Sequence, residues 1–367
     1  MDSRSTVLFA GGGTGGHLFP GIAIAQELLR RDPASRVVFI GSTRAIESTI
    51  VAEQGFEHRM LPVESLPMLK RNPLKFVYRN WQAWHAATRL LREFNPTAVV
   101  GLGGYASAPL VWAASRHRVP VILLEQNVIP GRTTRWLSRC ASHVCVTFAQ
   151  TSSQLPQASN VIVTGNAIRS EITALHPRIR SNTSPPELLI LGGSQGADSL
   201  NEAVLFAVRQ LSDSVAGWSV VHQTGPRQVD RVREEYNDLG ITACVESFFH
   251  DLPSRYSTAS LVVSRAGAST LTELACAGIP MILLPYPHAA DDHQRANAKV
   301  FSDANAAVIV EHVATAEATG TNLATAMRSL MNDSQRLQTM GNAAKQLGRP
   351  NAAERIADVV TNAIGQT

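Results

Sequence analysis

Short, continuous apolar runs recur along the chain, and polar or glycine-rich residues follow many of them. Runs of this length indicate strands that are buried in a sheet. The expected strands are Val7–Ala10, Val37–Ile40, Ala98–Val100, Val119–Leu124, Val144–Val146, Val161–Val163, Glu187–Leu191, Val220–His222, Ala259–Val263 and Met281–Leu284. Between strands, apolar residues lie three or four positions apart, the spacing of amphipathic helices. This alternation predicts an α/β fold with parallel sheets, in two doubly wound domains.

Three of these strands lead into glycine-rich loops, at Gly11–Gly16, Gly101–Gly104 and Gly192–Ala197. In a parallel sheet such loops lie at the carboxyl edge, where open α/β folds bind their ligands. Glycines let the backbone approach a phosphate closely, and a helix N-terminus favours its negative charge. Three such loops together indicate a ligand site more strongly than any one of them does.

The first loop satisfies the dinucleotide-binding pattern G-x-G-x-x-G through Gly11, Gly13 and Gly16. Pro20 is expected to open the helix that follows, over Gly21–Arg30. The next strand ends in glycine and serine rather than in the acidic residue that a dinucleotide ribose requires, which disfavours a nicotinamide cofactor. A P-loop is excluded because no Gly-Lys-Ser/Thr occurs. We therefore expect a phosphorylated ligand here, and a bare glycine turn is the alternative.

A strand–loop–helix–strand unit lies between Ser264 and Ala298. Ser269 or Thr270 is expected to cap its helix, and Gly278 to end it. Glu273 has two interpretations: it completes a capping box with Thr270, or its carboxylate holds two hydroxyls of a sugar. The spacing alone favours the cap.

The polar loop beyond this helix contains residue types that bind metals, namely His288, Asp291, Asp292 and His293. However, the chain has no Asp-x-Asp, and no pair of histidines at i, i+4 spacing lies near a carboxylate. The sequence therefore predicts no metal site.

The 367 residues suffice for two domains with substantial cores. Composition places the linker near His176–Glu187, and a crossing near Thr164–Gly165 is equally compatible. The net charge of +4 suits an anionic ligand or surface but is too small to indicate nucleic-acid binding. Four cysteines without zinc or disulfide spacing are typical of reduced, mostly buried thiols in a cytosolic protein. No signal peptide is expected, and no apolar window approaches the roughly 18 residues needed to cross a bilayer.

The segment Ser65–Arg92 is basic and aromatic and contains no acidic residue. Its cations are Lys70, Arg71, Lys75, Arg79, Arg89 and Arg92, and its aromatic residues include Phe76, Tyr78, Trp81 and Trp84. This composition is typical of a segment that lies at a membrane interface. A core-packed helix with a solvated basic face has the same composition, so both interpretations remain open.

Seven motifs follow one another along the chain: GGGTGGHLFP, GLGGYASAP, EQNVIPG, GNAIR, LGGSQGA, SRAGASTLTELACAGIP and LLPYPHAADDHQRANA. In order and spacing, these motifs resemble those of the MurG family, over about Val7 to Ala357. The resemblance implies a GT-B fold, in which two Rossmann-like domains face a cleft. It implies an acceptor- and membrane-facing domain over 1–164 and 345–367, with a returning final helix, and a domain that binds UDP-N-acetylglucosamine over 165–344.

The resemblance also implies a reaction and its place in the cell. The expected activity is inverting, metal-independent and cofactor-free transfer of N-acetylglucosamine from UDP to the 4-hydroxyl of N-acetylmuramoyl-(pentapeptide)-pyrophosphoryl-undecaprenol, for peptidoglycan synthesis. The enzyme would act as a peripheral protein on an anionic surface, the cytoplasmic face of the inner membrane, with cell-wall synthesis proteins as further partners and no nucleic acid. A UDP-N-acetylglucosamine epimerase of the same fold is the alternative, and a nicotinamide oxidoreductase is a remote one.

Residue by residue, the resemblance implies donor contacts from Thr14, Gly15, Gly16, Asn127, Arg169, Ser194, Phe249, Ala268, Ser269, Thr270, Glu273 and Gln294. It implies acceptor contacts from Gly12, Gly13, Gly103, Gly104 and Tyr105, and membrane contacts from Lys70, Arg71, Lys75, Phe76, Arg79 and Trp81. At Glu273 it reverses the preference, so the ribose role is now favoured over the cap.

His17 is the implied general base, because an imidazole has an unperturbed pKa of about 6.5 and removes protons near neutral pH. An orienting hydrogen bond is the alternative role for His17, and Glu125 is a second candidate base. Leu124, Ala167 and Thr134 depart from the family, which has His, Pro and Asn at these positions. These departures concern the geometry of loops rather than the activity.

Overall fold

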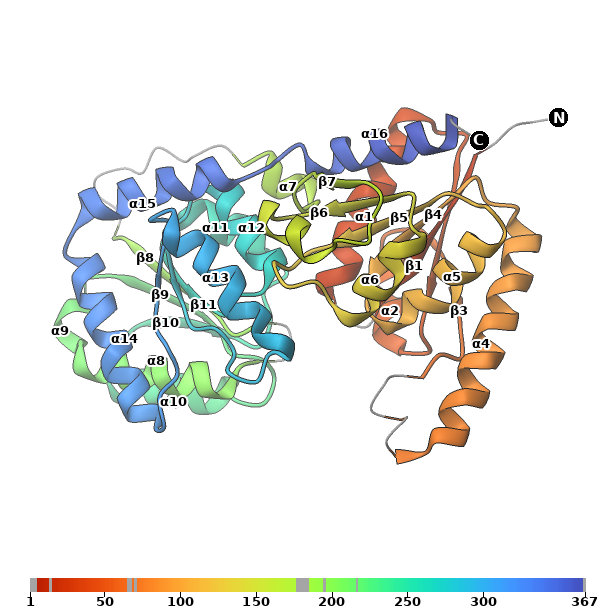
Figure 1. The fold of residues 1–367 in the computed structure, drawn as a ribbon. Coiled ribbons are helices and arrows are strands. Elements are labelled where there is room, and N and C mark those ends of the chain that lie inside the picture. Colours follow the sequence, from red (N-terminus) through yellow and green to blue (C-terminus); the bar gives the residue numbers. More distant parts are fainter. Residues whose placement is uncertain are drawn as a thin grey trace. The chain divides into compact units, whose positions relative to one another are not determined.

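The computed structural model describes residues 5–12, 15–64, 68, 71–175, 185–193, 196–215 and 217–365. The chain divides into two compact units: unit 1 is Met1–Arg169 with Arg349–Thr367, and unit 2 is Ser170–Gly348. Each unit is built on one parallel sheet that is flanked by helices (Figure 1). The predicted α/β class with two doubly wound parallel sheets is therefore confirmed.

Within the described residues, unit 1 holds a seven-stranded sheet in the order β3-β2-β1-β4-β5-β6-β7. Its strands are β1 (Thr6–Gly11), β2 (Arg36–Gly41), β3 (Glu57–Met60), β4 (Ala98–Gly103), β5 (Val121–Glu125), β6 (His143–Val146) and β7 (Val161–Val163). Its α-helices are α1 (Gly15–Arg31), α2 (Ala45–Glu53), α4 (Pro73–Phe94), α5 (Ala108–Arg116), α6 (Arg132–Leu137) and α16 (Ala352–Gly365).

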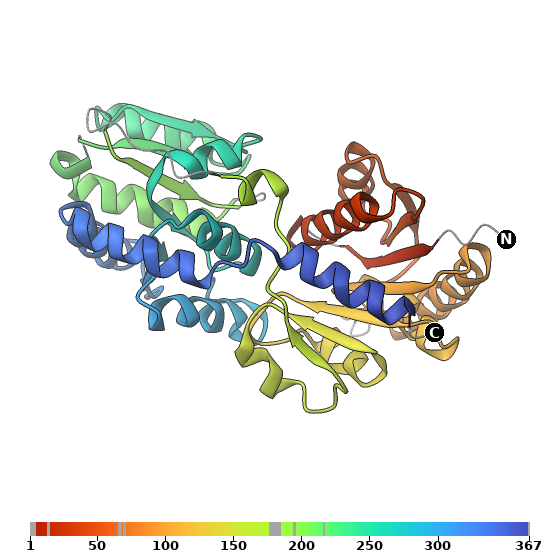
Figure 2. The same cartoon turned by 90° about the horizontal axis from the view of Figure 1, so that it is seen from above.

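Both faces of this sheet are covered by helices. Val7 and Phe9 of β1 belong to one apolar core, with α1, α2 and α16, and Figure 2 shows α16 running beside this part of the sheet. Leu8 and Ala10 belong to the opposite core, with α4, α5 and α6. Because successive side chains of a strand point to opposite faces, a strand covered on both sides is apolar throughout. This is why the strands appear in the sequence as continuous apolar runs.

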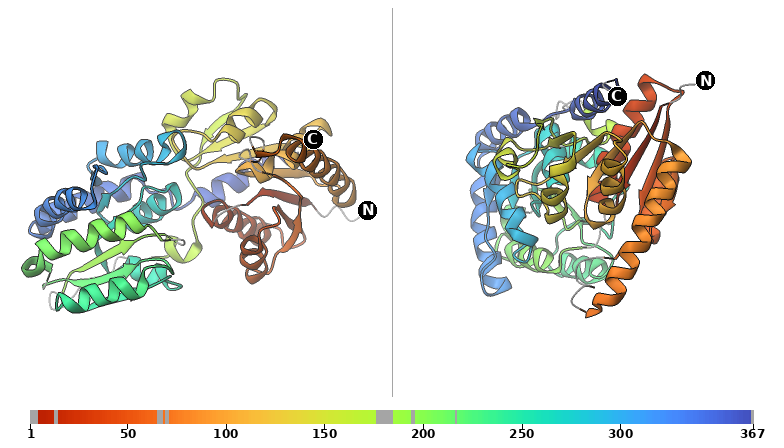
Figure 3. Two further views of the ribbon diagram at one scale, coloured as in Figure 1. Left: turned by 90° about the horizontal axis from the view of Figure 1, so that it is seen from below. Right: turned by 45° about the vertical axis from the view of Figure 1, so that its right-hand side comes forward.

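Unit 2 repeats the architecture with a six-stranded sheet among its described residues, in the order β10-β9-β8-β11-β12-β13. Its strands are β8 (Glu187–Leu191), β9 (Ser219–Gln223), β10 (Ala243–Glu246), β11 (Ala259–Ser264), β12 (Met281–Leu283) and β13 (Ala307–Ile309). Its α-helices are α7 (Ser170–Thr173), α8 (Asp198–Gln210), α9 (Ser212–Val215), α10 (Val229–Asp238), α11 (Leu252–Thr258), α12 (Ala268–Ala277), α13 (His293–Asp303), α14 (Ala316–Met331) and α15 (Ser334–Leu347). α14 packs on α8, and α15 packs on α12 (Figures 1 and 3).

The chain passes between the units at Arg169/Ser170 and at Gly348/Arg349, a few residues after the boundaries expected at 164/165 and 344/345. The two crossing segments pack on each other within unit 1. A methyl group added at Gly165 would lie 2.8 Å from Cβ of Arg349, so the two segments are closely packed, and both belong to unit 1. α16 belongs to unit 1, as the family resemblance implies. The alternative linker at 176–187 lies largely outside the described residues.

Two helices begin earlier than predicted. α1 begins at Gly15 and runs through Pro20, so Pro20 does not open it. Glycine is a poor helix former, which hides this start in the sequence. α12 begins at Ala268, so Ser269 and Thr270 lie inside the helix and neither caps it.

Candidate functional site

In each unit, two of the predicted loops meet where the strand order reverses. β1 and β4 are neighbours at this point in unit 1, and Gly11 is paired with Gly103. β8 and β11 hold the same position in unit 2. Ligands of open α/β sheets bind outside the carboxyl ends of the strands at such a switch point. The topology therefore brings the first and second glycine loops together, and likewise the third loop and the start of α12.

His17 lies in the first turns of α1, beside the second glycine loop. Its Nδ1 is 3.1 Å from Oε1 of Gln126, whose Nε2 donates to the carbonyl of Leu102 at 3.1 Å. The carbonyl of Leu102 can only accept, so the side-chain amide of Gln126 must direct its NH2 group to Leu102 and its Oε1 to His17. Because Oε1 also only accepts, Nδ1 of His17 is the donor. In the neutral imidazole, Nε2 is then the ring nitrogen with a lone pair. A methyl group at Gly103 would lie 3.3 Å from the imidazole ring, so glycine gives His17 its space there.

Glu125 ends β5 and is 4% exposed. Its Oε1 accepts from the backbone N–H of Asn127 at 3.0 Å, and its Oε2 accepts from the N–H of Gly131 at 3.0 Å. Thr151 donates to the carbonyl of Asn127 at 3.0 Å. These bonds hold the loop 126–131 in one conformation. They favour an orienting role for Glu125 over that of a base, because the carboxylate already serves two backbone donors.

A buried carboxylate that the sequence did not single out lies under the first glycine loop. Glu47 of α2 is fully buried and accepts from the N–H of Ser42 at 2.7 Å and from its hydroxyl at 2.5 Å. A methyl group at Gly12 would lie 2.2 Å from Oε2 of Glu47, and one at Gly41 would lie 2.4 Å from it. Contact with this carboxylate explains glycine at both positions. It also gives Gly12 a packing role beside the acceptor role expected for it.

In unit 2, the N-terminus of α12 lies at the carboxyl edge of the sheet. Gly267 is its N-cap, with extended backbone and no side-chain capping bond, so its first N–H groups suit an anionic ligand. Glu273 lies further along α12 and is 8% exposed, and its Oε2 accepts from the hydroxyl of Tyr256 at 2.9 Å. Because the helix starts at Ala268, Glu273 is not in the third helical position that a capping box requires. The capping interpretation of Glu273 is therefore wrong.

Gln294 and Phe249, two further residues for which contacts with the sugar donor are expected, have defined hydrogen-bond partners. Oε1 of Gln294 accepts from the N–H of Tyr286 at 2.9 Å and from that of Ala266 at 3.3 Å, so the carbonyl end of this amide faces the protein. The N–H of Phe249 donates to Oε1 of Gln223 at 3.1 Å. The N–H of Phe249 is therefore engaged, and the donor contact implied for this residue stays a prediction.

Arg265 is a cation that sequence reasoning missed. One guanidinium nitrogen donates to the carbonyl of Leu284 at 2.9 Å and also contacts Nε2 of His312, and the other donates to Ser199 at 2.7 Å. Burial lowers the pKa of Arg265 to about 10, which leaves it charged at neutral pH. Burial, followed by the charge of Arg265, lowers the pKa of His312 to about 4, so His312 is a neutral acceptor. A fixed positive charge thus lies between the start of α8 and the end of β12.

Arg169 lies at the end of unit 1, with its guanidinium carbon 5.4 Å from the centre of the Phe19 ring on α1. Gly15 and Gly16 form the start of α1. Four predicted site residues lie outside the described residues: Gly13, Thr14, Lys70 and Ser194. Among the residues that the structure describes, no group of three or more His, Cys, Asp or Glu side chains could hold a metal ion.

The basic, aromatic segment forms most of α4, whose N-cap Asn72 accepts from the N–H of Lys75. Ala83, Ala87, Leu91 and Phe94 are buried, so the second half of the helix packs on the sheet. The first half exposes Leu74, Val77, Tyr78 and Trp81 by 55–83%, next to exposed Arg71, Lys75 and Arg79. Phe76 is only half-buried. The core-packed interpretation therefore holds for the second half of the helix, and the membrane interpretation stays a prediction for the first half. No helix in the described part of the chain is long and apolar enough to cross a membrane.

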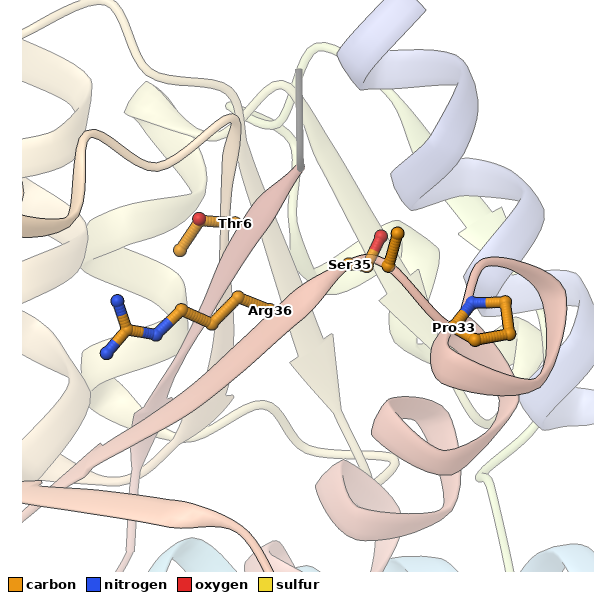
Figure 4. Close-up of a pocket in the computed structure, with 5 residues that line it drawn as sticks. Thr6, Pro33, Ser35 and Arg36 are labelled. Atoms are coloured by element: carbon orange, nitrogen blue, oxygen red, sulfur yellow. The ribbon is translucent and has the colours of Figure 1, made fainter. Parts of the chain in front are cut away.

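A separate pocket opens at the amino ends of β1 and β2, where Thr6, Pro33, Ser35 and Arg36 line it (Figure 4). The glycine loops follow the carboxyl ends of the strands, at the opposite edge of the sheet. This pocket therefore takes no part in the candidate site.

Comparison with known proteins identifies the two units. The glycosyltransferase family 28 N-terminal domain matches residues 7–146, and the family 28 C-terminal domain matches residues 187–356. Among solved structures, Acinetobacter baumannii MurG is 31% identical with a TM-score of 0.80, covering 98% of this chain and all of that one. A putative UDP-N-acetylglucosamine 2-epimerase from Listeria monocytogenes has a TM-score of 0.72 but only 13% identity, which shows a shared fold alone.

Curated relatives match over nearly the whole chain. A UDP-N-acetylglucosamine–N-acetylmuramyl-(pentapeptide) pyrophosphoryl-undecaprenol N-acetylglucosamine transferase from Syntrophotalea carbinolica is 40% identical, covering 98% of this chain and 99% of the relative. The protein of the same name from Myxococcus xanthus is also 40% identical, covering 98% and 94%. The chain is a glycosyltransferase with the GT-B fold, and it belongs to the MurG family.

Proposed function

We propose that the enzyme transfers N-acetylglucosamine from UDP-N-acetylglucosamine to the 4-hydroxyl of N-acetylmuramoyl-(pentapeptide)-pyrophosphoryl-undecaprenol, with inversion and without a metal ion. The product would be the disaccharide lipid used in cell-wall synthesis. The observation that carries this proposal is the 40% identity to transferases of that name over 98% of the chain.

On unit 2, we propose that the donor's diphosphate binds at the edge formed by the third glycine loop and the start of α12. UDP gains negative charge as it leaves, and helix N-termini and cations stabilise such charge. The N-terminus of α12 and the guanidinium of Arg265 provide a helix end and a cation within unit 2. Arg169 is the further cation that the family pattern assigns to phosphate. Glu273, oriented by Tyr256, would accept hydrogen bonds from the ribose hydroxyls.

On unit 1, we propose that His17 removes the proton from the acceptor's 4-hydroxyl. The bond from Nδ1 to Gln126 supports this role, because it leaves the lone pair on Nε2 to take the proton. The acceptor's pyrophosphate would lie on the first and second glycine loops, where Gly103 and Gly104 adopt positive φ angles of 99° and 70°. That conformation suits glycine, whose lack of a side chain lets a ligand approach the backbone closely.

The test of this function uses labelled UDP-N-acetylglucosamine and a lipid-linked N-acetylmuramoyl-pentapeptide acceptor, with and without a chelator. We expect a labelled, β-linked disaccharide lipid at an unchanged rate in the chelator, because charge stabilisation comes from the protein. Folded protein that forms no such product contradicts the assignment. Activity that disappears with the chelator and returns with magnesium or manganese contradicts only the metal-independent mechanism.

We further propose that the exposed face of α4 binds an anionic membrane surface. Neutralising Lys70, Arg71, Lys75 and Arg79 together should reduce co-sedimentation with anionic vesicles at least tenfold, since each cation near such a surface contributes about 1 kcal/mol. The matched control replaces Arg89 and Arg92, which are exposed at the other end of α4. If the quadruple variant sediments as the wild type does, α4 is a solvated surface helix.

A further inference from the structure

A cavity of about 390 Å³ opens in unit 1 between α4, the residues after β4 and the start of α6. Its walls are mainly apolar and include the aromatic side chains of Phe76, Trp84, Tyr105, Trp112 and Trp136. The ring centres of Trp84 and Trp112 are 5.9 Å apart, and those of Trp112 and Trp136 are 6.3 Å apart, so the three indoles form one continuous wall. The volume is typical of ligand pockets, which span about 300–1,000 Å³.

One end of the cavity lies at the second glycine loop. Tyr105 lines the cavity and directly follows Gly103 and Gly104, where we propose that the acceptor's pyrophosphate binds. Arg132 also lines the cavity, and the guanidinium carbon of Arg44 lies 5.9 Å from the centre of the Tyr105 ring. Glu64 lines the cavity as well, so its lining carries one cation and one carboxylate, and Arg44 lies beside Tyr105.

The other side of the cavity is formed by α4. Phe76 and Trp84 line the cavity from this helix, whose neighbouring residues Val77 and Trp81 are 62% and 55% exposed. These exposed residues belong to the surface that we propose binds the membrane. The cavity thus continues the proposed membrane surface toward the proposed phosphate loop.

We infer that this cavity binds the first isoprene units of the acceptor's polyprenyl chain, those nearest the pyrophosphate. The inference rests on the proposed function, because it takes the polyprenyl pyrophosphate from it. A chain anchored in the bilayer and bonded to a phosphate on the second loop must cover the distance between them. An apolar cavity that reaches the proposed phosphate loop matches the two parts of such a molecule. Trp136, which is 50% exposed, forms an accessible part of the wall.

The test measures binding in solution without vesicles, by calorimetry. Two soluble acceptor analogues share the N-acetylmuramoyl-pentapeptide pyrophosphate, and one carries a three-isoprene tail while the other ends in a methyl ester. We expect the tail to lower the wild-type Kd about tenfold or more, because each buried methylene adds to affinity. In Trp136→Asp the two Kd values should agree within about twofold, since a carboxylate disfavours an apolar tail. Trp136→Phe should restore most of the preference.

Two variants control for general effects. Met60→Asp, at a 58% exposed position of β3, should keep the tenfold preference and bind vesicles normally. Trp81→Asp should weaken vesicle binding and keep the preference, because Trp81 does not line the cavity. Equal Kd values for the two analogues in the wild type overturn the inference. The inference is also overturned if Trp136→Asp keeps the tail preference but binds vesicles less well. The cavity would then be a site for bilayer lipid. Tail-dependent binding without transfer would support the cavity and contradict the proposed function.

Discussion

His17→Ala is expected to lower kcat by about 100-fold or more, because a positioned general base contributes about 10²–10⁴-fold. The affinity for UDP-N-acetylglucosamine should change little, since the donor's contacts are proposed on other residues. Steady-state kinetics, with donor binding measured separately, provides both readouts.

The control for this prediction is Gln126→Leu, which keeps the imidazole but removes the acceptor that holds the proton on Nδ1. Either ring nitrogen can then carry the proton, so we expect a smaller fall in kcat, about tenfold. A near-normal kcat for His17→Ala would exclude His17 as the base. Equal losses in both variants, together with reduced thermal stability, would indicate that the pair only supports the loop.

Glu273→Gln is expected to raise the KM for UDP-N-acetylglucosamine by about 10- to 100-fold. Hydrogen bonds to a charged acceptor contribute about 1.5–3 kcal/mol, and each 1.4 kcal/mol corresponds to a factor of ten. The amide preserves the size of the side chain, so the change isolates the charge. The same substitution should have a smaller effect on a 2′-deoxyribose donor, which lacks one of the two proposed partners and keeps the 3′-hydroxyl. Kinetics of the wild type and the variant with both donors therefore form a double-mutant cycle, which measures the interaction between Glu273 and the 2′-hydroxyl.

Tyr256→Phe is the matched control, because it removes the bond that orients Glu273 and leaves the carboxylate in place. We expect a smaller rise in KM, with the preference for ribose over deoxyribose retained. If Glu273→Gln lowers thermal stability and affects both donors equally, then Glu273 serves the packing of α12 rather than the ribose.

The strands were predictable because both sheets are covered on both faces. A run such as Leu188–Leu191 is fully or almost fully buried, which requires apolar residues throughout and makes the strand visible in the sequence. The meeting of the glycine loops also follows from the sequence, because parallel strands present their carboxyl ends at one edge. The start of α12 could not be predicted from the sequence, because its N-cap is a glycine whose role depends on its extended backbone rather than on a side chain.

The partners of the site residues could not be predicted, because they are distant in the sequence. His17 and Gln126 are 109 positions apart, and Arg265 and His312 are 47 apart. Glu47 lies only five positions after Ser42, but its contact with Gly12 depends on the pairing of β1 with β2. Local patterns indicate which residues carry chemistry, and the fold decides which atoms they meet.

Because the chain returns to unit 1 through α16, the two units can complete their folding at different times during synthesis. Ser170–Gly348 is one uninterrupted stretch, whereas unit 1 needs residues from both ends of the chain. Ile356, Ala357 and Val360 of α16 complete the apolar core on the α1 side of the sheet. On the ribosome, unit 2 can therefore fold as soon as it emerges, while one apolar face of the sheet in unit 1 stays uncovered until α16 has also emerged. Premature termination just before α16 would release a chain prone to aggregate through that side.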